Sequence, residues 1–375
     1  MEYVQEGIAT LHDFGDASPA APTDSATVVV PMTEREHAGL AAERVLSALE
    51  AVSPERVVVP LRASADRVEA IVEWLDEFDL PLSILWCDGP RLSELLSEAD
   101  LNGARGKGRD VWLALGIASD SEYIVVHDAD AKSYDARHVP KLLFPLAHGK
   151  AVSKGYYARV ENDRLYGRLF RLFYRPLIEA IEAERDAPIL EYLGAFRYAL
   201  AGEFATTGRL ARRLRIQRGW GLEVGTLGEA FRLVGAEGSA QVDLGVHEHD
   251  HRAVSGPSGL SDMSRQVGRT LLQALEDNGV EPPYETLEDR YRTAAERLVD
   301  GYALDAAFNG FEYDRADELA QIDTYADAIE RPKLDTRLPA WEMAPIEPGD
   351  VANATLEDLA DVTAANRRER GWRTT

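Results

Sequence analysis

The chain has 375 residues, of which 28% are charged and 45% hydrophobic, a composition typical of a globular protein with a sizeable core. Its 65 acidic residues outnumber its 41 basic ones, and the formal net charge of −24 argues against nonspecific binding to nucleic acid or to an anionic membrane. The single cysteine, Cys87, excludes an internal disulfide and a cysteine-based zinc site. Because no signal peptide and no apolar stretch approaching about 18 residues is evident, we expect a soluble, cytoplasmic protein without membrane insertion.

Arginine supplies most of the basic residues, and lysine is rare. The lysines are Lys107, Lys132, Lys141, Lys150, Lys154 and Lys333. An acidic, lysine-poor surface suits a cytoplasm with high salt, where counterions screen the repulsion between like charges. We therefore predict a halophilic, haloarchaeal source, with an acidic mesophilic enzyme as the alternative.

From Thr27 to Val126, apolar runs rich in β-branched residues alternate with amphipathic stretches. The apolar runs predict strands at residues 27–30, 56–61, 82–86 and 123–126. The amphipathic stretches predict helices at residues 36–51, 65–77, 91–99 and 107–118. Strands that alternate with helices of this length indicate βαβ units. We therefore predict an α/β fold with a mostly parallel sheet and helices on both faces.

The alternation loosens after residue 130. We expect strands at 152–160 and 239–246, and helices at 165–183, 263–278, 287–304, 316–329 and 356–370. The expected organisation is an N-terminal arm and linker at 1–26, an α/β catalytic domain at 27–260 and a helical C-terminal region at 261–375. Because isolated helices need a surface on which to bury their apolar faces, we expect this C-terminal region to form a homodimer.

The strongest chemical signal is Asp128-Ala129-Asp130, which follows closely on the predicted strand 123–126. In open parallel sheets, ligands bind at the carboxyl ends of the strands. Carboxylates are hard oxygen donors that suit Mg²⁺ or Mn²⁺, ions that keep positions open for phosphate oxygens and water. The motif predicts a divalent-metal site, and a capped turn is the alternative for so short a motif.

Alternate histidines form a second signal, since His247, His249 and His251 follow the predicted strand 239–246. If this segment is extended, the three imidazoles lie on one side of it. One neutral imidazole joined to the two carboxylates would fit Mn²⁺ best and Mg²⁺ acceptably. A separate zinc site formed by all three histidines and a solvated polar loop are the alternatives.

Gly106-Lys107-Gly108 opens the predicted helix that leads to the Asp-Ala-Asp strand. Glycines let backbone amides approach an anion, the helix N-terminus favours negative charge, and Lys107 adds a point charge. The segment therefore predicts a phosphate contact, although its spacing is not that of a P-loop.

Glycine also flanks Trp220, which is followed by Glu223. A flat ring and a hydroxyl acceptor are the pair of side chains that a hexose needs. A core tryptophan and a carboxylate at a helix N-terminus are the alternatives.

Eight short segments, taken in order, resemble the retaining GT-A glycosyltransferases that synthesise glucosyl-3-phosphoglycerate or mannosyl-3-phosphoglycerate. The resemblance runs from about residue 27 to residue 267. The segments are Val28-Val-Val-Pro31, Gly106-Lys-Gly108, Asp128-Ala-Asp130, Lys154-Gly-Tyr-Tyr157, Leu200-Ala-Gly-Glu-Phe204, Gly219-Trp-Gly-Leu-Glu223, Leu244-Gly-Val-His-Glu-His249 and Met263-Ser-Arg-Gln-Val267.

The resemblance implies a Rossmann-like nucleotide-sugar-binding half at 27–130 and an acceptor-binding half at 131–260. It implies donor contacts from Pro31, Met32, Glu34, Ser64, Lys107, Asp128, Ala129, Trp220 and Arg252. It implies metal ligation by Asp128, Asp130 and His249, and catalytic roles for Glu223 and Asp130. It implies acceptor contacts from Lys154, Gly167, Arg168 and His251.

The implied activity is the metal-dependent transfer of a hexose from a nucleotide sugar of the UDP-glucose or GDP-mannose type. The implied acceptor is a small anion such as 3-phosphoglycerate, with Arg171 able to assist Arg168. Phe170, His247 and His251 depart from the family pattern, as does Leu61-Arg-Ala-Ser64 in the nucleoside region. A glycosyltransferase for a polysaccharide or lipid acceptor, and a nucleotide-sugar-binding protein without transfer activity, are therefore the alternatives.

Overall fold

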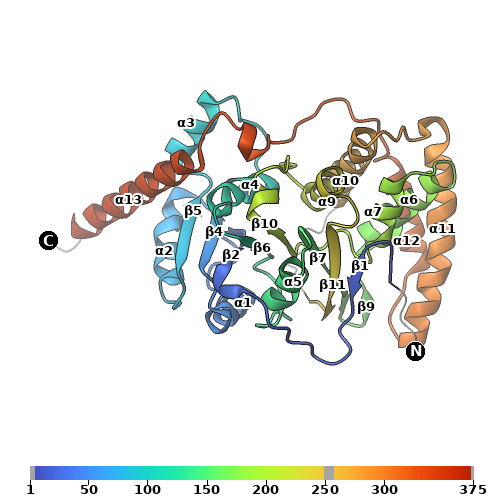
Figure 1. Ribbon diagram of the computed structural model, residues 1–375, viewed down its shortest axis with the longest axis horizontal. Helices are drawn as coiled ribbons and strands as arrows, with labels where there is room; N and C mark the ends of the chain where they lie inside the picture. The colour runs from blue at the N-terminus through green and yellow to red at the C-terminus, as the bar shows by residue number, and fades with distance from the viewer. Residues whose placement is uncertain (1–4, 249–256, 373–375) are drawn as a thin grey trace. The chain divides into compact units, whose positions relative to one another are not determined.

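The computed structural model describes residues 5–248 and 257–372 (Figure 1). The chain forms two compact units, each assembled from three stretches of sequence and each with its own hydrophobic core. Unit 1 comprises Met1–Asp16, Lys154–Ala201 and Trp220–Thr336, and unit 2 comprises Ala17–Ser153, Gly202–Gly219 and Arg337–Thr375. The boundaries predicted at residues 26 and 260 are not among the ends of these units.

Parallel strands form the centre of unit 2. β2 (Ala26–Val29) pairs in parallel with both β4 (Arg56–Arg62) and β6 (Tyr123–Val126). β3 (Met32–Thr33) and β5 (Leu82–Trp86) also pair in parallel with β4, whereas β10 (Phe204–Thr207) pairs antiparallel with β6. The valine and isoleucine side chains of β2, β4 and β6 are buried, as expected for parallel strands covered on both faces.

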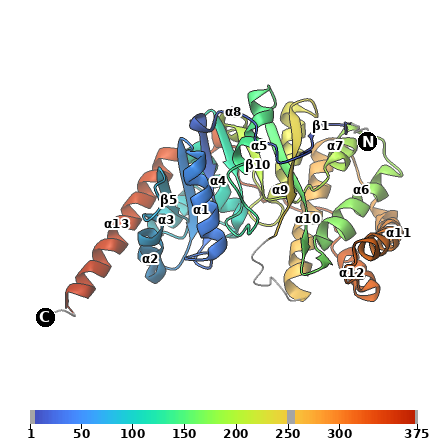
Figure 2. The same cartoon turned by 90° about the horizontal axis from the view of Figure 1, so that it is seen from below.

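Helices of unit 2 follow the strands in the order that βαβ units require. They are α1 (Leu40–Val52), α2 (Ala65–Leu75), α3 (Pro90–Glu98), α4 (Lys107–Ala118), α5 (His138–Ala147), the short α8 (Gly208–Ala211) and the C-terminal α13 (Pro348–Trp372), with 3-10 turns η1 (Thr23–Ser25) and η3 (Trp341–Met343). α13 packs against α2 and α3, as both views show (Figures 1 and 2). The C-terminal end of the chain is therefore part of unit 2.

Asp358 of α13 caps the N-terminus of α3. Its carboxylate is buried, accepts hydrogen bonds from the backbone amides of Arg91 (3.1 Å) and Leu92 (3.3 Å), and pairs with the Arg91 guanidinium at 3.2 Å. The residue at the N-cap of α3 is Gly89, which has no side chain to accept these bonds. The cap is thus supplied by a residue distant in sequence.

We expect Asp358→Ala to lower the free energy of unfolding by about 1–2 kcal/mol, because two helix amides lose their acceptor. Urea unfolding measures this change. The matched control is Asp361→Ala, which removes a more exposed carboxylate that also pairs with Arg91, and should cost less than about 1 kcal/mol. Equal losses in the two variants would show that Asp358 acts only as a surface ion-pair partner.

Unit 1 contains a second group of strands. β1 (Ala9–Leu11) pairs in parallel with β11 (Ser239–Val246), and β7 (Val152–Ala158) is the other neighbour of β11. β8 (Val160–Glu161) and β9 (Arg164–Leu165) form a hairpin. Its two turn residues, Asn162 and Asp163, have φ of 49° and 56°, the paired positive values that a type I′ turn requires.

Helices make up most of unit 1. They are the π-helix η2 (Phe170–Tyr174), α6 (Arg175–Glu182), α7 (Pro188–Ala195), α9 (Leu222–Val234), α10 (Pro257–Asp277), α11 (Tyr284–Asn309) and α12 (Arg315–Ala326). α11 and α12 lie side by side in both views (Figures 1 and 2). Both pack against η2, so the C-terminal helices support the segment that follows the β8–β9 hairpin.

The predicted α/β fold with a mostly parallel sheet is confirmed. The predicted strands and the helices at 65–77, 91–99 and 107–118 agree with β2, β4–β7, β11 and α2–α4 to within a few residues.

The helix predicted at 36–51 begins only at Leu40, because the Glu36 carboxylate accepts hydrogen bonds from the amide and hydroxyl of Thr33 and holds a turn there. The helix predicted at 165–183 begins at Phe170, since β9 occupies its start. Part of the predicted N-terminal arm is strand β1, which pairs with β11. No helix in the described parts of the chain is long and apolar enough to cross a membrane.

Candidate functional site

Parallel pairing brings the carboxyl ends of β2, β4 and β6 to one edge of the unit 2 sheet. The residues that follow these strands at this edge are Pro31 and Met32 after β2, Ser64 after β4, and Asp128, Ala129 and Asp130 after β6. Six of the residues predicted to contact the donor or the metal are therefore placed together by the strand order alone.

Asp128 and Asp130 lie in different surroundings. Oδ1 of Asp128 is 2.6 Å from Nζ of Lys107, so the predicted phosphate-binding lysine pairs with a predicted metal ligand. Oδ1 of Asp130 is buried and, within the described residues, has no hydrogen-bond partner. Burial and the negative charge of Asp128 raise the pKa of Asp130 to about 7, while Lys107 acts in the opposite direction. Two carboxylates that repel each other, one with an unsatisfied oxygen, suit a divalent cation.

The described residues supply only part of a metal site. Within 5–248 and 257–372, no three histidine, cysteine or acidic side chains are grouped so that they could hold an ion together. His249, predicted as the third ligand, lies outside the described residues, as do His251 and Arg252. The two aspartates nevertheless fit Mg²⁺ or Mn²⁺, since both ions prefer oxygen donors.

Gly202 and Glu203 also belong to this edge, although no role was predicted for them. β10 runs antiparallel to β6, and Phe204 pairs with Val126, so the residues just before β10 lie beside those just after β6. A Cβ atom on Gly202 would lie 2.4 Å from Oδ2 of Asp128 and 3.0 Å from Nζ of Lys107. Glu203 is fully buried, and its charge contributes to the raised pKa of Asp130. The segment Leu200-Ala-Gly-Glu-Phe204, which is part of the family resemblance, was the signal in the sequence that could have identified them.

We expect Gly202→Ala to weaken Mn²⁺ binding by about tenfold or more, because the methyl group would displace the Asp128 carboxylate from its position beside Lys107. Calorimetric titration with MnCl₂ measures the affinity. Gly349→Ala is the matched control, since a Cβ atom there meets nothing within 4 Å. Unchanged Mn²⁺ affinity in a folded Gly202→Ala protein would contradict a metal role for Asp128.

The buried His127 precedes the two aspartates. Nε2 of its ring lies 2.9 Å from the Tyr134 hydroxyl, and burial lowers the pKa of His127 to about 4. Its imidazole is therefore neutral near pH 7. His127 therefore adds no positive charge beside the aspartate pair, whereas Lys107 does.

The glycines beside Lys107 have a structural role that the sequence did not predict. A Cβ atom on Gly106 would lie 2.7 Å from the carbonyl oxygen of Arg218, and one on Gly108 would lie 1.8 Å from that of Gln217. The backbone amide of Arg109 donates to the Arg218 carbonyl at 3.0 Å. The glycines thus allow the 217–219 segment to cross the start of α4, and this crossing fixes the position of Lys107.

The residues predicted to meet the nucleoside are joined by hydrogen bonds. Oε2 of Glu34 accepts the backbone amide of Ser64 at 3.1 Å and its hydroxyl at 2.8 Å, and these bonds lower the pKa of Glu34. Arg62, in the segment that departs from the family pattern, lies 3.1 Å from Oδ2 of the buried Asp110 on α4. The Arg62 guanidinium therefore links the end of β4 to the helix that begins with Lys107.

Predicted acceptor residues lie in unit 1. Gly167 has φ of 75°, which favours glycine, and it precedes the π-helix η2, a distortion often found at functional sites. The Arg168 side chain is 35% exposed. By contrast, Arg171 is buried and makes two hydrogen bonds to Glu318, so it is not available to assist Arg168 with a ligand.

Lys154 is buried within unit 1, and its ammonium group donates to the carbonyl oxygen of Ala201. This contact ties the start of the β7 segment in unit 1 to the end of the 154–201 stretch. The predicted acceptor role of Lys154 stays a prediction.

Two of the departures from the family pattern, Phe170 and His247, are found in one aromatic cluster. The His247 ring stacks on Tyr157 with centroids 4.2 Å apart, and Tyr157 contacts Tyr198 at 5.1 Å. Phe170 meets Tyr198 edge-on at 5.2 Å. Arg159 donates to the Tyr198 hydroxyl at 3.3 Å. Both departures are thus accommodated by ring packing.

Trp220 and Glu223 lie at the start of α9. Trp220 is 42% exposed and its backbone amide donates to Oε1 of Gln266 at 3.0 Å. Glu223 is in the first turn of α9, where a carboxylate is stabilised by the helix dipole. The exposed ring excludes a core tryptophan, and the sugar-binding role of this pair stays a prediction.

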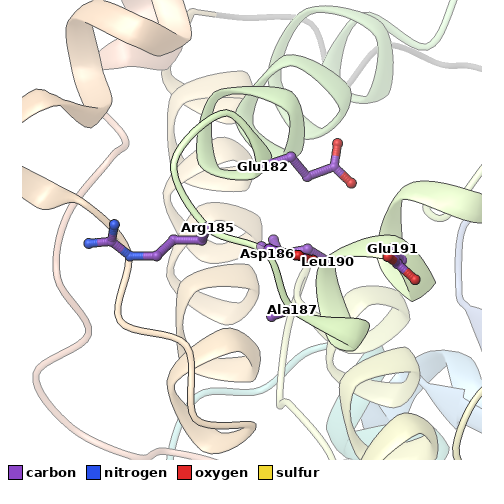
Figure 3. Close-up of a pocket in the computed structure, with 6 residues that line it drawn as sticks. All are labelled: Glu182, Arg185, Asp186, Ala187, Leu190 and Glu191. Atoms are coloured by element: carbon purple, nitrogen blue, oxygen red, sulfur yellow. The ribbon is translucent and has the colours of Figure 1, made fainter.

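A small pocket of about 220 Å³ lies between the end of α6 and the start of α7 in unit 1 (Figure 3). Its lining residues are Glu182, Arg185, Asp186, Ala187, Leu190 and Glu191. None of the predicted site residues is among them, so the candidate chemistry is not in this pocket.

Comparisons with known proteins point to one enzyme. No protein-family model matches the chain. It is 34% identical over 378 residues to the glucosyl-3-phosphoglycerate synthase of Methanococcoides burtonii, an alignment covering 92% of this chain and 94% of that protein. It is 35% identical over 323 residues to the enzyme of the same name from Persephonella marina, with 81% and 80% of the two chains covered.

A solved structure with a similar fold comes from Mycobacterium tuberculosis. The structure is that of glucosyl-3-phosphoglycerate synthase in complex with Mn²⁺, UDP-glucose and phosphoglyceric acid. It matches with a TM-score of 0.54 and 25% identity, covering 72% of this chain and 88% of that one. Another structure of that enzyme contains Mg²⁺ and UDP.

Proposed function

The chain belongs to the glucosyl-3-phosphoglycerate synthase family, and we propose that Asp128, Asp130 and Lys107 form the donor site of its reaction. The protein is a GT-A glycosyltransferase that uses Mg²⁺ or Mn²⁺ to transfer glucose to 3-phosphoglycerate. We propose UDP-glucose as its donor, which the solved structure from Mycobacterium tuberculosis contains. The observation that carries the residue assignment is the cluster of two repelling carboxylates and one lysine at the carboxyl edge of the parallel sheet. His249 as third ligand and Arg252 as a further diphosphate contact complete the proposal.

Stabilising the leaving group is the main chemical task of this site. When bound, the metal ion supplies positive charge next to the diphosphate. Lys107 adds a second positive charge, which the 217–219 crossing holds in place and which Asp128 balances until the donor arrives. A preformed cation of this kind stabilises charge that develops on the β-phosphate without reorganisation.

In the transfer step, the hydroxyl oxygen on C2 of the acceptor forms a bond to the anomeric carbon of glucose. The bond between that carbon and the β-phosphate oxygen breaks, and its electron pair leaves with UDP. The hydroxyl proton goes to the departing phosphate oxygen, on the same face of the sugar, so the anomeric configuration is retained. Glu223 and Trp220 orient the hexose, and the Glu34–Ser64 pair lies at the nucleoside.

Arg168 is the acceptor contact in this proposal, with Gly167 beside it. A partly exposed guanidinium can bind the carboxylate or the phosphate group of 3-phosphoglycerate. A polysaccharide or lipid acceptor would not need this positive charge. Phe170 packs against the rings of Tyr174 and Tyr198 and has no role in binding the charged end of the acceptor in this proposal.

A panel of donors and acceptors tests the proposal. The panel combines four donors, UDP-glucose, UDP-galactose, GDP-glucose and GDP-mannose, with 3-phosphoglycerate, with glycerate or with buffer alone. Each combination is measured with Mg²⁺ and with Mn²⁺, at low and at high salt. We expect the largest kcat/KM for UDP-glucose with 3-phosphoglycerate. If the release of nucleoside diphosphate does not depend on any of these acceptors, the assignment of 3-phosphoglycerate as the acceptor is contradicted.

The homodimer, the cytoplasmic location and the halophilic source are further parts of the proposal. The net charge of −24 supports a protein adapted to high salt, and the long helices α11 and α12 offer a surface for a second copy. Light scattering in 3 M KCl should give a dimer mass. A monomer at all salt concentrations would remove the homodimer from the proposal.

A further inference from the structure

Arg168 is held from one side by two carboxylates of α12. Its Nε donates to Oε1 of Glu318 at 3.1 Å, and its Nη2 donates to Oδ2 of Asp317 at 2.5 Å. About 150 residues of sequence separate Arg168 from these partners, all of which lie in unit 1. The contact therefore belongs to the folded unit and not to a local turn.

Glu318 is the fixed part of this contact. Its side chain is only 3% exposed, and its two oxygens accept both Nη groups of Arg171, at 3.0 Å and 2.9 Å. The Tyr313 hydroxyl donates to the same carboxylate at 3.0 Å. Because Arg171 lies within the π-helix η2, Glu318 connects α12 to the segment that carries Arg168.

The guanidinium of Arg168 still has donors to offer. The Nε–Nη2 edge faces the two carboxylates, and among the described residues Nη1 has no hydrogen-bond partner. Its side chain is 35% exposed, so part of it is accessible to a ligand. A planar guanidinium fixed along one edge can meet an anion with the other at little further cost in side-chain entropy.

Asp317 differs from Glu318 in exposure and effect. Its side chain is 55% exposed, so it contributes little to holding Arg168. Its negative charge nevertheless lies beside the nitrogen atoms that would face an anionic ligand. Glu318 therefore favours anion binding by fixing the guanidinium, whereas Asp317 opposes it by repulsion.

We propose that the α12 pair Asp317 and Glu318 sets the affinity for the acceptor: Glu318 is a positioning residue for Arg168, and Asp317 is a competing anion that the acceptor must overcome. This inference rests on the proposed function, in which Arg168 binds the charged end of 3-phosphoglycerate. It assigns a role in the acceptor site to C-terminal helices that the sequence associates only with dimerisation.

Opposite effects of two neighbouring substitutions test the proposal. Asp317→Asn should lower the KM for 3-phosphoglycerate by about two- to fivefold, because it removes repulsion and keeps the shape. Glu318→Gln should raise it by about five- to twentyfold, because the guanidinium of Arg168 loses its fixed partner. The KM for UDP-glucose should change by less than about twofold in both variants.

Asp323→Asn is the matched control. Asp323 lies on the same helix, is also exposed and pairs with Arg292 at 3.2 Å, so a general effect of charge on α12 would appear there too. If Glu318→Gln does not fold, Tyr313→Phe tests the same role of Glu318, because it removes only the hydroxyl that donates to Glu318. We expect Tyr313→Phe to raise the acceptor KM by about twofold.

Arg168→Gln separates this inference from the function on which it rests. If Arg168→Gln leaves the acceptor KM unchanged, the assignment of Arg168 in the proposed function fails. If Arg168→Gln raises the acceptor KM, the role of Arg168 stands. The role of the α12 pair is then overturned by either of two results: Asp317→Asn does not lower the acceptor KM, or Asp323→Asn lowers it equally.

Discussion

Asp130→Asn should lower kcat by about 10²–10³-fold or more with UDP-glucose and 3-phosphoglycerate. The Asp130 carboxylate has a buried oxygen without a partner in the described structure, and burial beside Asp128 raises its pKa to about 7. An amide keeps the shape but removes the charge that a divalent cation needs. The variant should fold normally, because the substitution relieves the repulsion from Asp128.

Two measurements separate this effect from a loss of stability. Calorimetric titration should show Mn²⁺ affinity reduced by at least about tenfold, and thermal unfolding without metal should show a melting temperature that is unchanged or higher. Asp79→Asn, at an exposed position of unit 2, should leave both quantities unchanged. If Asp130→Asn retains the wild-type kcat and Mn²⁺ affinity, the metal site is elsewhere.

Lys107→Met should lower kcat/KM for UDP-glucose by about 10²–10³-fold. The ammonium group lies 2.6 Å from Oδ1 of Asp128, and its charge lowers the pKa of Asp130, so it sits where the donor diphosphate is expected to bind. Methionine preserves most of the length of the side chain, and α4 should remain intact because its start is fixed by the 217–219 crossing.

Metal binding distinguishes this variant from Asp130→Asn. Removing a positive charge from beside the aspartate pair lowers the repulsion that Mn²⁺ meets there, so Mn²⁺ binding should not weaken once Asp130 is ionised. Because the loss of Lys107 also raises the pKa of Asp130, the titration is repeated at increasing pH. Donor affinity should fall while metal affinity is retained. The matched control is Lys333→Met, which removes an exposed lysine of unit 1. A Lys107→Met protein that keeps the wild-type KM for UDP-glucose would contradict a phosphate contact.

Local sequence signals predicted which residues lie together at the proposed donor site. The valine-rich runs of β2, β4 and β6 are buried on both faces, which identifies parallel strands. When strands are parallel, the residues that come after them meet at one edge of the sheet. The place of Asp128-Ala129-Asp130 at this edge therefore follows from its position directly after a strand. The Lys107–Asp128 ion pair confirms that the lysine at the start of α4 reaches this edge.

Long-range pairing could not be predicted in the same way. β10 is a four-residue strand that runs antiparallel to β6, and only this direction explains why Gly202 lies beside Asp128. The contact between Arg168 and Glu318 joins positions about 150 residues apart and has no local pattern. Short strands and distant ion pairs depend on tertiary packing, which periodicity does not report.

Glycine was the residue type whose role the sequence predicted least completely. Gly106 and Gly108 flank a lysine at a helix N-terminus, which is the arrangement expected of a phosphate loop. In the structure both also allow the close crossing of the 217–219 backbone, since a Cβ atom on Gly108 would lie only 1.8 Å from the Gln217 carbonyl oxygen. The sequence cannot tell whether a small residue makes room for a ligand or for the chain itself.

Analysis of the reaction products by NMR is the most direct test of the central claim. The protein is incubated with UDP-glucose, 3-phosphoglycerate and Mn²⁺ at high salt, with Asp130→Asn run in parallel. The account predicts equal amounts of UDP and one glucosyl-3-phosphoglycerate with the α configuration of the donor, and at most traces from Asp130→Asn. Release of free glucose with 3-phosphoglycerate unchanged, or a β-linked product, would contradict it.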